Sequence, residues 1–126
     1  MRRLYAAAAL AVLVAVVCWW GIRTLQRDTA QMFGILDIAQ TAMTEDDVIS
    51  AREEAEMLEK TWTQAESRLA VFCHHKLIED IGVVLAGLPS LAESATRAEF
   101  LAECSRARIL LLHLREDEAL RWRSVL

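Results

Sequence analysis

The sequence predicts an all-α protein: an N-terminal transmembrane helix that continues into a juxtamembrane helix, then a long antiparallel helical hairpin, in a three-helix arrangement. Three observations support this fold class. The chain of 126 residues has only four glycines and one proline. After the first twenty residues, no stretch alternates apolar and polar residues with the period of two typical of a strand. Apolar residues instead recur at steps of three and four, which places them on one face of a helix.

The membrane anchor is predicted from residues 4–22, a run of nineteen residues without a charge. At about 1.5 Å per residue, such a helix covers about 28 Å, close to the hydrocarbon thickness of a bilayer. Tyr5 lies at one end of the run, and Trp19 and Trp20 lie at the other, as in the aromatic belts of membrane proteins. We therefore expect residues 1–25 to form an anchor that binds the lipid bilayer.

The charges beside this run predict its orientation. Arg2, Arg3 and the amino terminus precede it, whereas Arg23, Arg27 and Asp28 follow it. The positive-inside rule then keeps the N-terminus in the cytoplasm. The chain is thus expected to be a single-pass protein of the cell membrane, with an extracytoplasmic domain over residues 26–126.

Two alternatives to a retained anchor remain. A cleaved signal peptide requires small residues shortly before the cut, but this run ends in Val-Val-Cys-Trp-Trp. A helix buried in a soluble protein would not explain the paired arginines and the aromatic residues at both ends. The retained anchor is the interpretation that fits the residues best.

The first helix is expected to continue beyond the membrane to about residue 43, with a juxtamembrane part over residues 26–43. Gly34 is a point at which it can bend. Thr44 is expected to cap the next helix, because three acidic residues follow it and suit the positive end of a helix dipole. The apolar face of this part consists of Leu25, Thr29, Met32, Leu36, Ala39 and Met43.

The second helix is expected over residues 45–88. Its first apolar face runs from Val48 to Phe72, meets Lys76, and resumes out of phase from Ile78 to Leu88. Pro89 is expected to end this helix, since proline cannot continue the hydrogen-bond ladder. A straight helix of this length, antiparallel to the first, would carry charged residues into the lipid, which is too costly. Either it bends near the shift, or the hairpin swings away from the anchor.

The last helix is expected over residues 97–121, because Thr96 and Glu99 have the spacing of a capping box. Pairing Leu88 with Arg97 sets a hairpin register that places Trp62 near Trp122. The apolar face of this helix consists of Phe100, Cys104, Ala107, Leu111 and Leu114.

The same register brings two His/Glu pairs together. His75 and Glu79 are four residues apart, and His113 and Glu116 are three apart, so each pair shares a helix face. Two histidines and two carboxylates are a set that can bind a transition metal or respond to pH. The simpler interpretation is that Glu79 pairs with Arg106, and Glu116 with Arg68, around partly buried histidines. We assign no cofactor.

Three cysteines, Cys18, Cys73 and Cys104, are interpreted as small apolar residues. The hairpin register separates Cys73 from Cys104 by about 12 Å along the axis, too far for a disulfide. The odd total leaves pairing between two chains open.

Charge and motifs exclude several functions. From Thr29 onward there are ten Lys and Arg against seventeen Asp and Glu, a net charge of −7. Such a surface argues against nucleic acid and against broad adhesion to anionic lipid. The chain has no nucleophile elbow, phosphate loop, Cys-x-x-Cys pair or serine triad order, so we expect no enzyme.

Several short motifs resemble a known family. Trp62 precedes Phe72-x-x-His75 by ten residues, and the run His75-x-x-Ile78-Glu79-x-Ile81 follows, continued by Leu85 and Leu88. Near the C-terminus, residues 113–118 and 124–126 resemble a second pattern, with Leu114 in place of an isoleucine and Ser124 in place of an asparagine. Together they are similar to the bacterial domain-of-unknown-function family forty-three sixty-three. The resemblance implies a small membrane-anchored protein without an established activity.

We therefore expect a non-catalytic accessory or interaction module, which docks on itself or on another membrane protein. The alternative is an extracytoplasmic metal- or pH-responsive sensor that uses the His/Glu cluster. The amphipathic ending, residues 121–126, is a further segment that can dock. The residues singled out for interaction or structure are Trp62, Phe72, Ile78, Ile81, Leu85, Leu88, Glu118 and Trp122.

Overall fold

Four helices make up the structure, a computed structural model that describes residues 1–94 and 96–125. They are α1 (Arg2–Thr44), α2 (Val48–Phe72), α3 (His75–Ser94) and α4 (Arg97–Val125). The all-α prediction is confirmed, but the number of helices is four and not three. Within these ranges the description excludes the side chains of Phe72, Glu118, Ala119, Arg121, Trp122, Ser124 and Val125.

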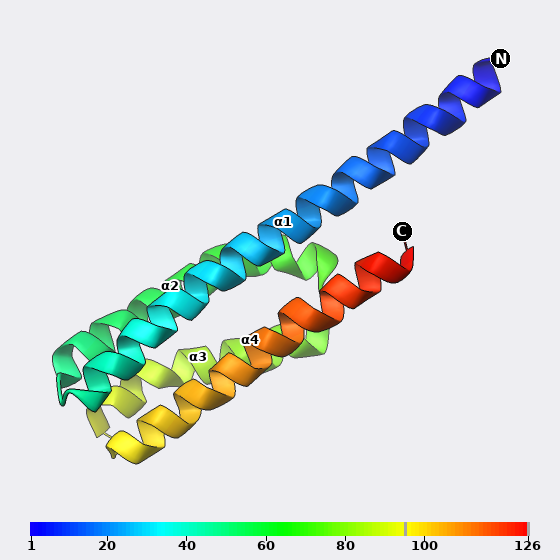
Figure 1. Cartoon of the computed structure of the whole chain (residues 1–126). Helices are drawn as coiled ribbons and strands as arrows, with labels where there is room; N and C mark the ends of the chain where they lie inside the picture. The colour runs from blue at the N-terminus through cyan, green and yellow to red at the C-terminus, as the bar shows by residue number, and fades with distance from the viewer. Residues whose placement is uncertain (95, 126) are drawn as a thin grey trace.

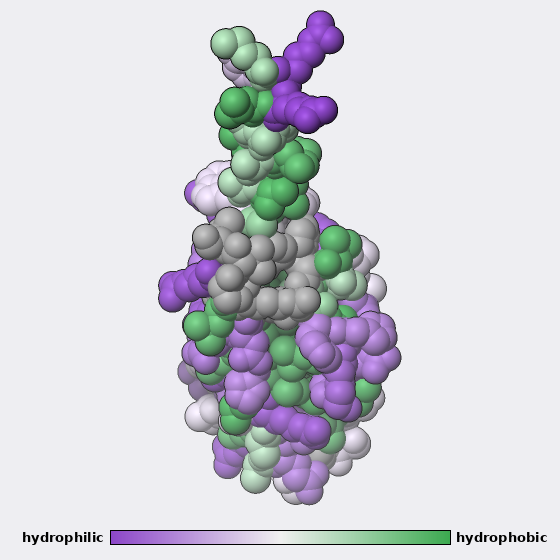
Figure 2. Space-filling model, turned by 90° about the vertical axis from the view of Figure 1, so that its right-hand side faces the viewer, coloured by the Kyte–Doolittle hydropathy of each residue, from purple (hydrophilic) through white to green (hydrophobic). Residues whose placement is uncertain are grey.

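The helices form an antiparallel bundle in which each helix contacts its two neighbours. Helix α1 packs against α2 and α4, and α3 packs against the same two helices from the other side (Figure 1). Helix α1 continues well beyond the others, so its first part projects from the bundle like a rod (Figure 2). Residues 1–17 are all exposed, and burial begins at Cys18. We call residues 1–17 the stalk.

Helix α1 confirms the prediction of one continuous helix from the apolar run to about Met43. It does not end at Gly34, and it carries one buried face into the bundle, because its buried residues recur at steps of three and four. The buried residues that form this face include Cys18, Leu25, Asp28, Met32, Leu36, Ala39 and Met43.

The N-cap residue of the second helix lies three residues later than predicted. Thr44 is the last residue of α1, and Asp47 caps α2 by accepting a hydrogen bond from the Ser50 amide at 3.2 Å. This hydrogen bond lowers the pKa of Asp47. The turn is tight because Asp46 has a positive φ of 60°, which Asp tolerates better than most residues. The N-cap of α2 is therefore Asp47, the last of the three acidic residues, and not Thr44.

The prediction of one helix over residues 45–88 is wrong. Helix α2 ends at Phe72, Cys73 adopts an extended conformation (φ −112°, ψ 161°), and α3 begins at His75. The two apolar faces that meet here are out of phase, so one straight helix cannot turn both toward the same core. The chain reverses instead, and both faces are buried. After this reversal α3 runs back away from the stalk (Figure 1).

Pro89 does not end its helix, contrary to the prediction. It lies inside α3, which continues to Ser94. A proline inside a helix costs about 3 kcal/mol. Leu85, Leu88 and Ala92 are buried on one face around it, and this burial offsets the cost. Because α3 extends past Leu88, the predicted pairing of Leu88 with Arg97 is displaced.

Helix α4 begins as predicted. Thr96 accepts a hydrogen bond from the Glu99 amide at 3.2 Å, which is one half of a capping box. The helix ends at Val125, four residues beyond the expected end. The predicted face is confirmed, since its residues are fully buried, and these are Phe100, Cys104, Ala107, Leu111 and Leu114.

Candidate functional site at the stalk end of the bundle

The stalk leaves the bundle at the end where the α2–α3 junction and the last turns of α4 also lie (Figure 1). Two contacts fix how the helices align there. Both carboxylate oxygens of Asp28 accept hydrogen bonds from Arg68 of α2 at 3.3 Å. The Arg115 guanidinium of α4 lies 5.2 Å from the centre of the Phe33 ring. We call the end of the bundle at which the stalk emerges the stalk end, and the opposite end the far end.

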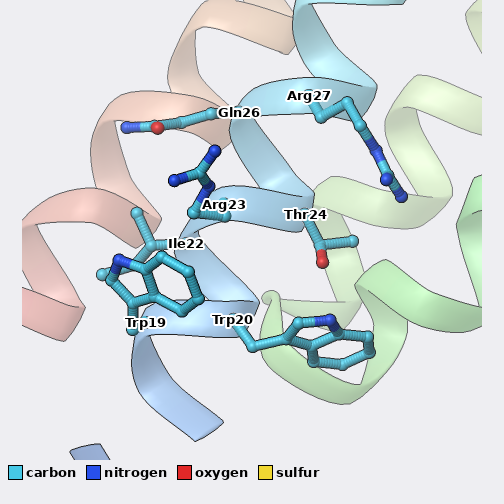
Figure 3. A pocket seen from close by; sticks show the side chains of 7 residues that line it. All are labelled: Trp19, Trp20, Ile22, Arg23, Thr24, Gln26 and Arg27. Atoms are coloured by element: carbon cyan, nitrogen blue, oxygen red, sulfur yellow. The ribbon is translucent and has the colours of Figure 1, made fainter. Parts of the chain in front are cut away.

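A cavity of about 790 Å³ lies at the stalk end, against the segment of α1 between Trp19 and Arg27. Trp19, Arg23 and Gln26 lie on the side of α1 toward α4. Trp20 and Arg27 lie on the opposite side, toward α2 and α3, which are drawn in green (Figure 3). The indole and guanidinium groups of this segment are therefore divided between two sides of α1, with Trp19 and Arg23 on one side and Trp20 and Arg27 on the other.

Arg23 is held by an aromatic ring. Its guanidinium carbon lies 5.0 Å from the centre of the Trp19 ring, within the range of a cation–π interaction. This contact orients Arg23 without neutralising its charge. In the described part of the chain neither Arg23 nor Arg27 forms an ion pair, so both charges can meet a ligand.

The inner side of this segment carries the most buried charge of the described residues. The Asp28 side chain is only 4% exposed, whereas that of its partner Arg68 is 42% exposed. Thr29 is fully buried and donates a hydrogen bond to the Leu25 carbonyl at 2.8 Å. These groups are satisfied within the bundle, so they hold α1 against α2 and are not reactive centres.

Charge differs between the two ends of the bundle. At the stalk end, residues 19–28, 68–76 and 119–125 contain six Arg and Lys and one Asp, and Glu79, Asp80, Glu116 and Asp117 lie within about one helical turn of these segments. At the far end, residues 45–56 and 93–99 contain eight Asp and Glu and two Arg. The far end is therefore acidic, whereas basic and acidic residues occur together near the stalk end.

The four candidate metal ligands do not form one cluster. His75 Nε2 lies 3.2 Å from Glu79 Oε1, and their side chains are 83% and 65% exposed. His113 and Glu116 are exposed as well. Among the described residues, no three His, Cys, Asp or Glu side chains gather closely enough to hold a metal ion. The structure brings together only the first pair.

The ion pairs expected around these residues are also different. Arg68 pairs with Asp28 and not with Glu116, because α2 packs against α1. Arg106 lies 4.0 Å from Glu103 of its own helix and not against Glu79. Other pairs join the helices near the turns, and these are Arg97–Asp46, Arg108–Asp37 and Arg52–Glu93.

The residues singled out for interaction are mostly core residues. Trp62, Ile78, Ile81, Leu85 and Leu88 are buried within the bundle. The side chains of Phe72, Glu118 and Trp122 lie outside the described residues. The apolar faces expected to dock on a partner are therefore used, where they are described, to hold this chain's own helices together.

Trp62 does not lie where the hairpin register placed it. Its Nε1 atom is 3.3 Å from the point that a Cβ atom on Gly82 would occupy, so the indole lies against α3 at Gly82, where no side chain separates them. The Nε1–H group is buried and has no hydrogen-bond partner among the described residues. Trp62 is thus a core residue of the α2–α3 contact.

Sequence reasoning missed the Asp28–Arg68 pair. The signal was visible, since Asp28 lies three residues after Leu25 and four before Met32, on the predicted apolar face. A charged residue at such a position requires a partner from another helix. Which helix supplies it depends on the packing of α2 against α1.

All three cysteines lie within the described part of the chain. They are buried, and none of them forms a disulfide. Burial raises the pKa of Cys104 from its ordinary value near 9 to about 12, and the nearby Arg108 lowers it by less. The core position predicted for Cys73 and Cys104 is confirmed.

Because burial raises the pKa of the Cys104 thiol, we expect the free energy of unfolding to fall in alkali. The unfolded thiol ionises near pH 9 and the folded thiol only near 12, so the free energy of unfolding falls as pH rises above about 9. Urea unfolding at about pH 7 and about pH 10 measures this fall. It is expected to be smaller in Cys104→Ala, and an equal fall in both proteins would contradict the assignment.

Helix α1 is the one described helix that is long and apolar enough to cross a membrane. Only 11% of its most apolar window is buried in the bundle, unlike the core helix of a globular domain.

Comparison with known proteins gives one family. A family model described as "Domain of unknown function (DUF4363)" matches residues 19–125. Neither the curated proteins nor the solved structures give a match. The matched segment begins one residue after Cys18, the first buried residue, so it coincides with the bundle and excludes the stalk. It also confirms the family suggested by the motifs around Trp62 and His75. The chain therefore belongs to the DUF4363 family of domains of unknown function.

Proposed function

We propose that this protein is a membrane-anchored helical interaction module without catalytic activity, which docks on itself or on another membrane protein. The observation that carries the proposal is the division of α1 into two parts. Its stalk, residues 1–17, is wholly exposed and is uncharged from Leu4 onward, and the same helix then forms one wall of the bundle (Figure 2). A bilayer would cover the stalk, and the bundle would be held rigidly at the membrane surface.

The anchor in this proposal is the apolar run over residues 4–22. Its outward side chains include Leu10, Val12 and Leu13, each more than half exposed. In water this surface would be unfavourable, since each buried apolar side chain is worth about 1.5–3 kcal/mol. In lipid the helix satisfies its own backbone hydrogen bonds and requires no other element. The positive charge of Arg2 and Arg3 supports an N-terminus in the cytoplasm and an extracytoplasmic bundle.

The stalk also supports a docking role. Exposed apolar residues of the bundle include Ile49 and Val71 of α2 and Val83 of α3. The stalk is exposed along its whole apolar run from Leu4 to Val17, and it is rich in alanine from Ala6 to Ala15. Small residues let helices approach closely within a bilayer. A partner would therefore contact the stalk inside the membrane.

No reaction is part of the proposal. The His and Glu residues with the chemistry for one are exposed and separate, and the buried polar groups of the described chain serve packing. The stalk end carries charge and aromatic rings, which suits binding and not catalysis.

Two variants test the proposal. Deleting residues 2–17 is expected to release a folded helical bundle that alkaline carbonate extracts from membranes, whereas the full chain stays bound. Replacing residues 4–17 by leucines is expected to retain anchoring but to abolish the cross-links formed by the full chain within native membranes. Full extraction of the intact chain would overturn the anchor, and unchanged cross-links in the polyleucine variant would overturn docking through the stalk.

A further inference from the structure

The stalk is shorter than the hydrocarbon layer that it would have to cross. Its uncharged part, residues 4–17, contains fourteen residues. At about 1.5 Å per residue it covers about 21 Å, whereas the hydrocarbon core of a bilayer is about 30 Å thick. The uncharged run reaches about 28 Å only when residues 18–22 are included. A bilayer that covers the whole run therefore covers more than the stalk.

Residues 18–22 already belong to the bundle. Cys18 is 3% exposed and Gly21 is buried, because the other helices pack against α1 from this point on. Trp19 and Trp20 are 59% and 52% exposed, and they lie on opposite sides of α1 (Figure 3). Indole rings favour the boundary between lipid and water, and a bilayer meets an embedded helix on every side. Both rings would therefore lie in this boundary, together with the first turn of the bundle.

The α2–α3 turn lies at nearly the same level. Arg68 contacts Asp28, and α2 is antiparallel to α1, so Val71 lies about 5 Å nearer to the stalk than this contact (Figure 1). Ile22, the end of the uncharged run, lies about 9 Å nearer than Asp28. Val71 is thus about 5 Å outside the hydrocarbon core, within the headgroup layer, which is about 5–7 Å thick on each side.

Basic residues at this level fit the headgroup layer. Lys76 is exposed at the start of α3. The contact of Arg115 with Phe33 aligns α4 with α1, which places Arg123 at about the level of Val71. Long basic side chains can lay their methylene groups against lipid and keep the charge among headgroups. A deeper position would carry these charges into hydrocarbon, which is costly.

Acidic residues of the neighbouring turns are set back from this layer. Glu79 and Asp80 lie about 6 Å into α3, which runs away from the stalk (Figure 1). Glu116 and Asp117 precede Arg123 by at least six residues, which is about 9 Å along α4. Immersion to the depth of the α2–α3 turn therefore leaves these carboxylates in water.

We infer that the stalk end of the bundle is immersed in the headgroup layer, where the α2–α3 turn contacts phospholipid through Val71. The inference rests on the proposed function, because it requires the stalk to lie in the bilayer. The Val71 side chain is 77% exposed and is available for this contact. Phospholipid is the occupant that the length of the uncharged run brings to this surface in every anchored chain.

The experiment places a photoreactive benzophenone amino acid at Val71 of the full chain, in vesicles of phosphatidylcholine. Illumination is expected to give a covalent phospholipid adduct, which mass spectrometry detects. The matched control carries the same group at Ile49, which is 74% exposed and lies about 33 Å away at the other end of α2. Ile49 is expected to give no adduct above that of the unmodified chain. Circular dichroism checks that each variant keeps its helices.

A longer stalk tests the argument from length. Seven leucines inserted between Leu10 and Ala11 extend the uncharged part of the stalk to about 31 Å, and they add about two full turns, so the faces of α1 stay aligned. The stalk can then span the hydrocarbon core alone. The phospholipid adduct at Val71 is expected to be lost in this variant.

Each contrary outcome has a definite meaning. No adduct at Val71 would mean that the bilayer thins around the stalk instead, and this would overturn the inference. Equal adducts at Val71 and Ile49, an adduct at Val71 to a second copy of the chain, or an adduct that persists with the longer stalk would overturn it as well. Carbonate extraction is measured in parallel. A chain that resists extraction but gives no lipid adduct refutes this inference alone, whereas extraction of the intact chain refutes the proposed anchor.

Discussion

Replacing Trp62 with alanine is expected to lower the free energy of unfolding by about 3–5 kcal/mol. Trp62 is 2% exposed and fills the contact between α2 and α3 beside Gly82. Alanine would leave a cavity that the surrounding helices can close only in part. Chemical denaturation of the full chain in detergent micelles, followed by circular dichroism, measures the change.

Trp62→Phe separates the two properties of the indole. It leaves a smaller cavity, and it removes the buried Nε1–H group, which has no partner among the described residues. An unsatisfied buried donor costs about 1–3 kcal/mol, so its removal offsets much of the lost packing. We expect a net loss below about 1.5 kcal/mol. Val71→Ala, at a side chain that is 77% exposed, is the control and should change stability by less than about 0.5 kcal/mol. A loss near that of the control in Trp62→Ala would contradict the core role.

Replacing Arg68 with methionine is expected to lower the free energy of unfolding by about 2–3 kcal/mol. The change leaves the Asp28 carboxylate buried without its partner from α2. The full cost of breaking a buried pair is larger, but the Arg68 side chain is 42% exposed and solvent screens part of the interaction. The measurement is again denaturation of the full chain.

A double-mutant cycle isolates this ion pair. Arg68→Met with Asp28→Asn is expected to recover at least about 1 kcal/mol relative to Arg68→Met alone, because the uncompensated charge is gone. Arg106→Met is the matched control, since Arg106 contacts Glu103 only at 4.0 Å on the surface. It should cost less than about 0.5 kcal/mol. Additive effects in the cycle would mean that Asp28 and Arg68 do not stabilise each other.

Local patterns were sufficient for part of the fold. The steps of three and four along α1 and α4 identified the buried faces, and the spacing of Thr96 and Glu99 located the start of α4. These features depend on residues within one or two turns of each other, so the sequence contains them directly. The family also followed from short motifs, which lie between Trp62 and Leu88 and near the C-terminus, and a family model matches residues 19–125.

Other features depended on competition between distant residues. A shift of the apolar face at Phe72 permits a bend or a reversal, and the choice depends on which face α1 presents to α2. Pro89 would end an isolated helix, but burial of Leu88 and Ala92 against the bundle keeps α3 intact. The register that would bring His75 and His113 together was displaced by these two features.

The sequence by itself determined that this protein is helical, which faces of α1 and α4 are buried, and that an uncharged run precedes the bundle. Only the tertiary structure decided that Asp28 pairs with Arg68, that Trp62 lies against Gly82, and that the reversal between α2 and α3 lies at the stalk end. The physical reason is the same in each case. Periodicity records what one helix buries, whereas pairing between helices depends on the reversal at Cys73, which brings segments far apart in the chain to one end.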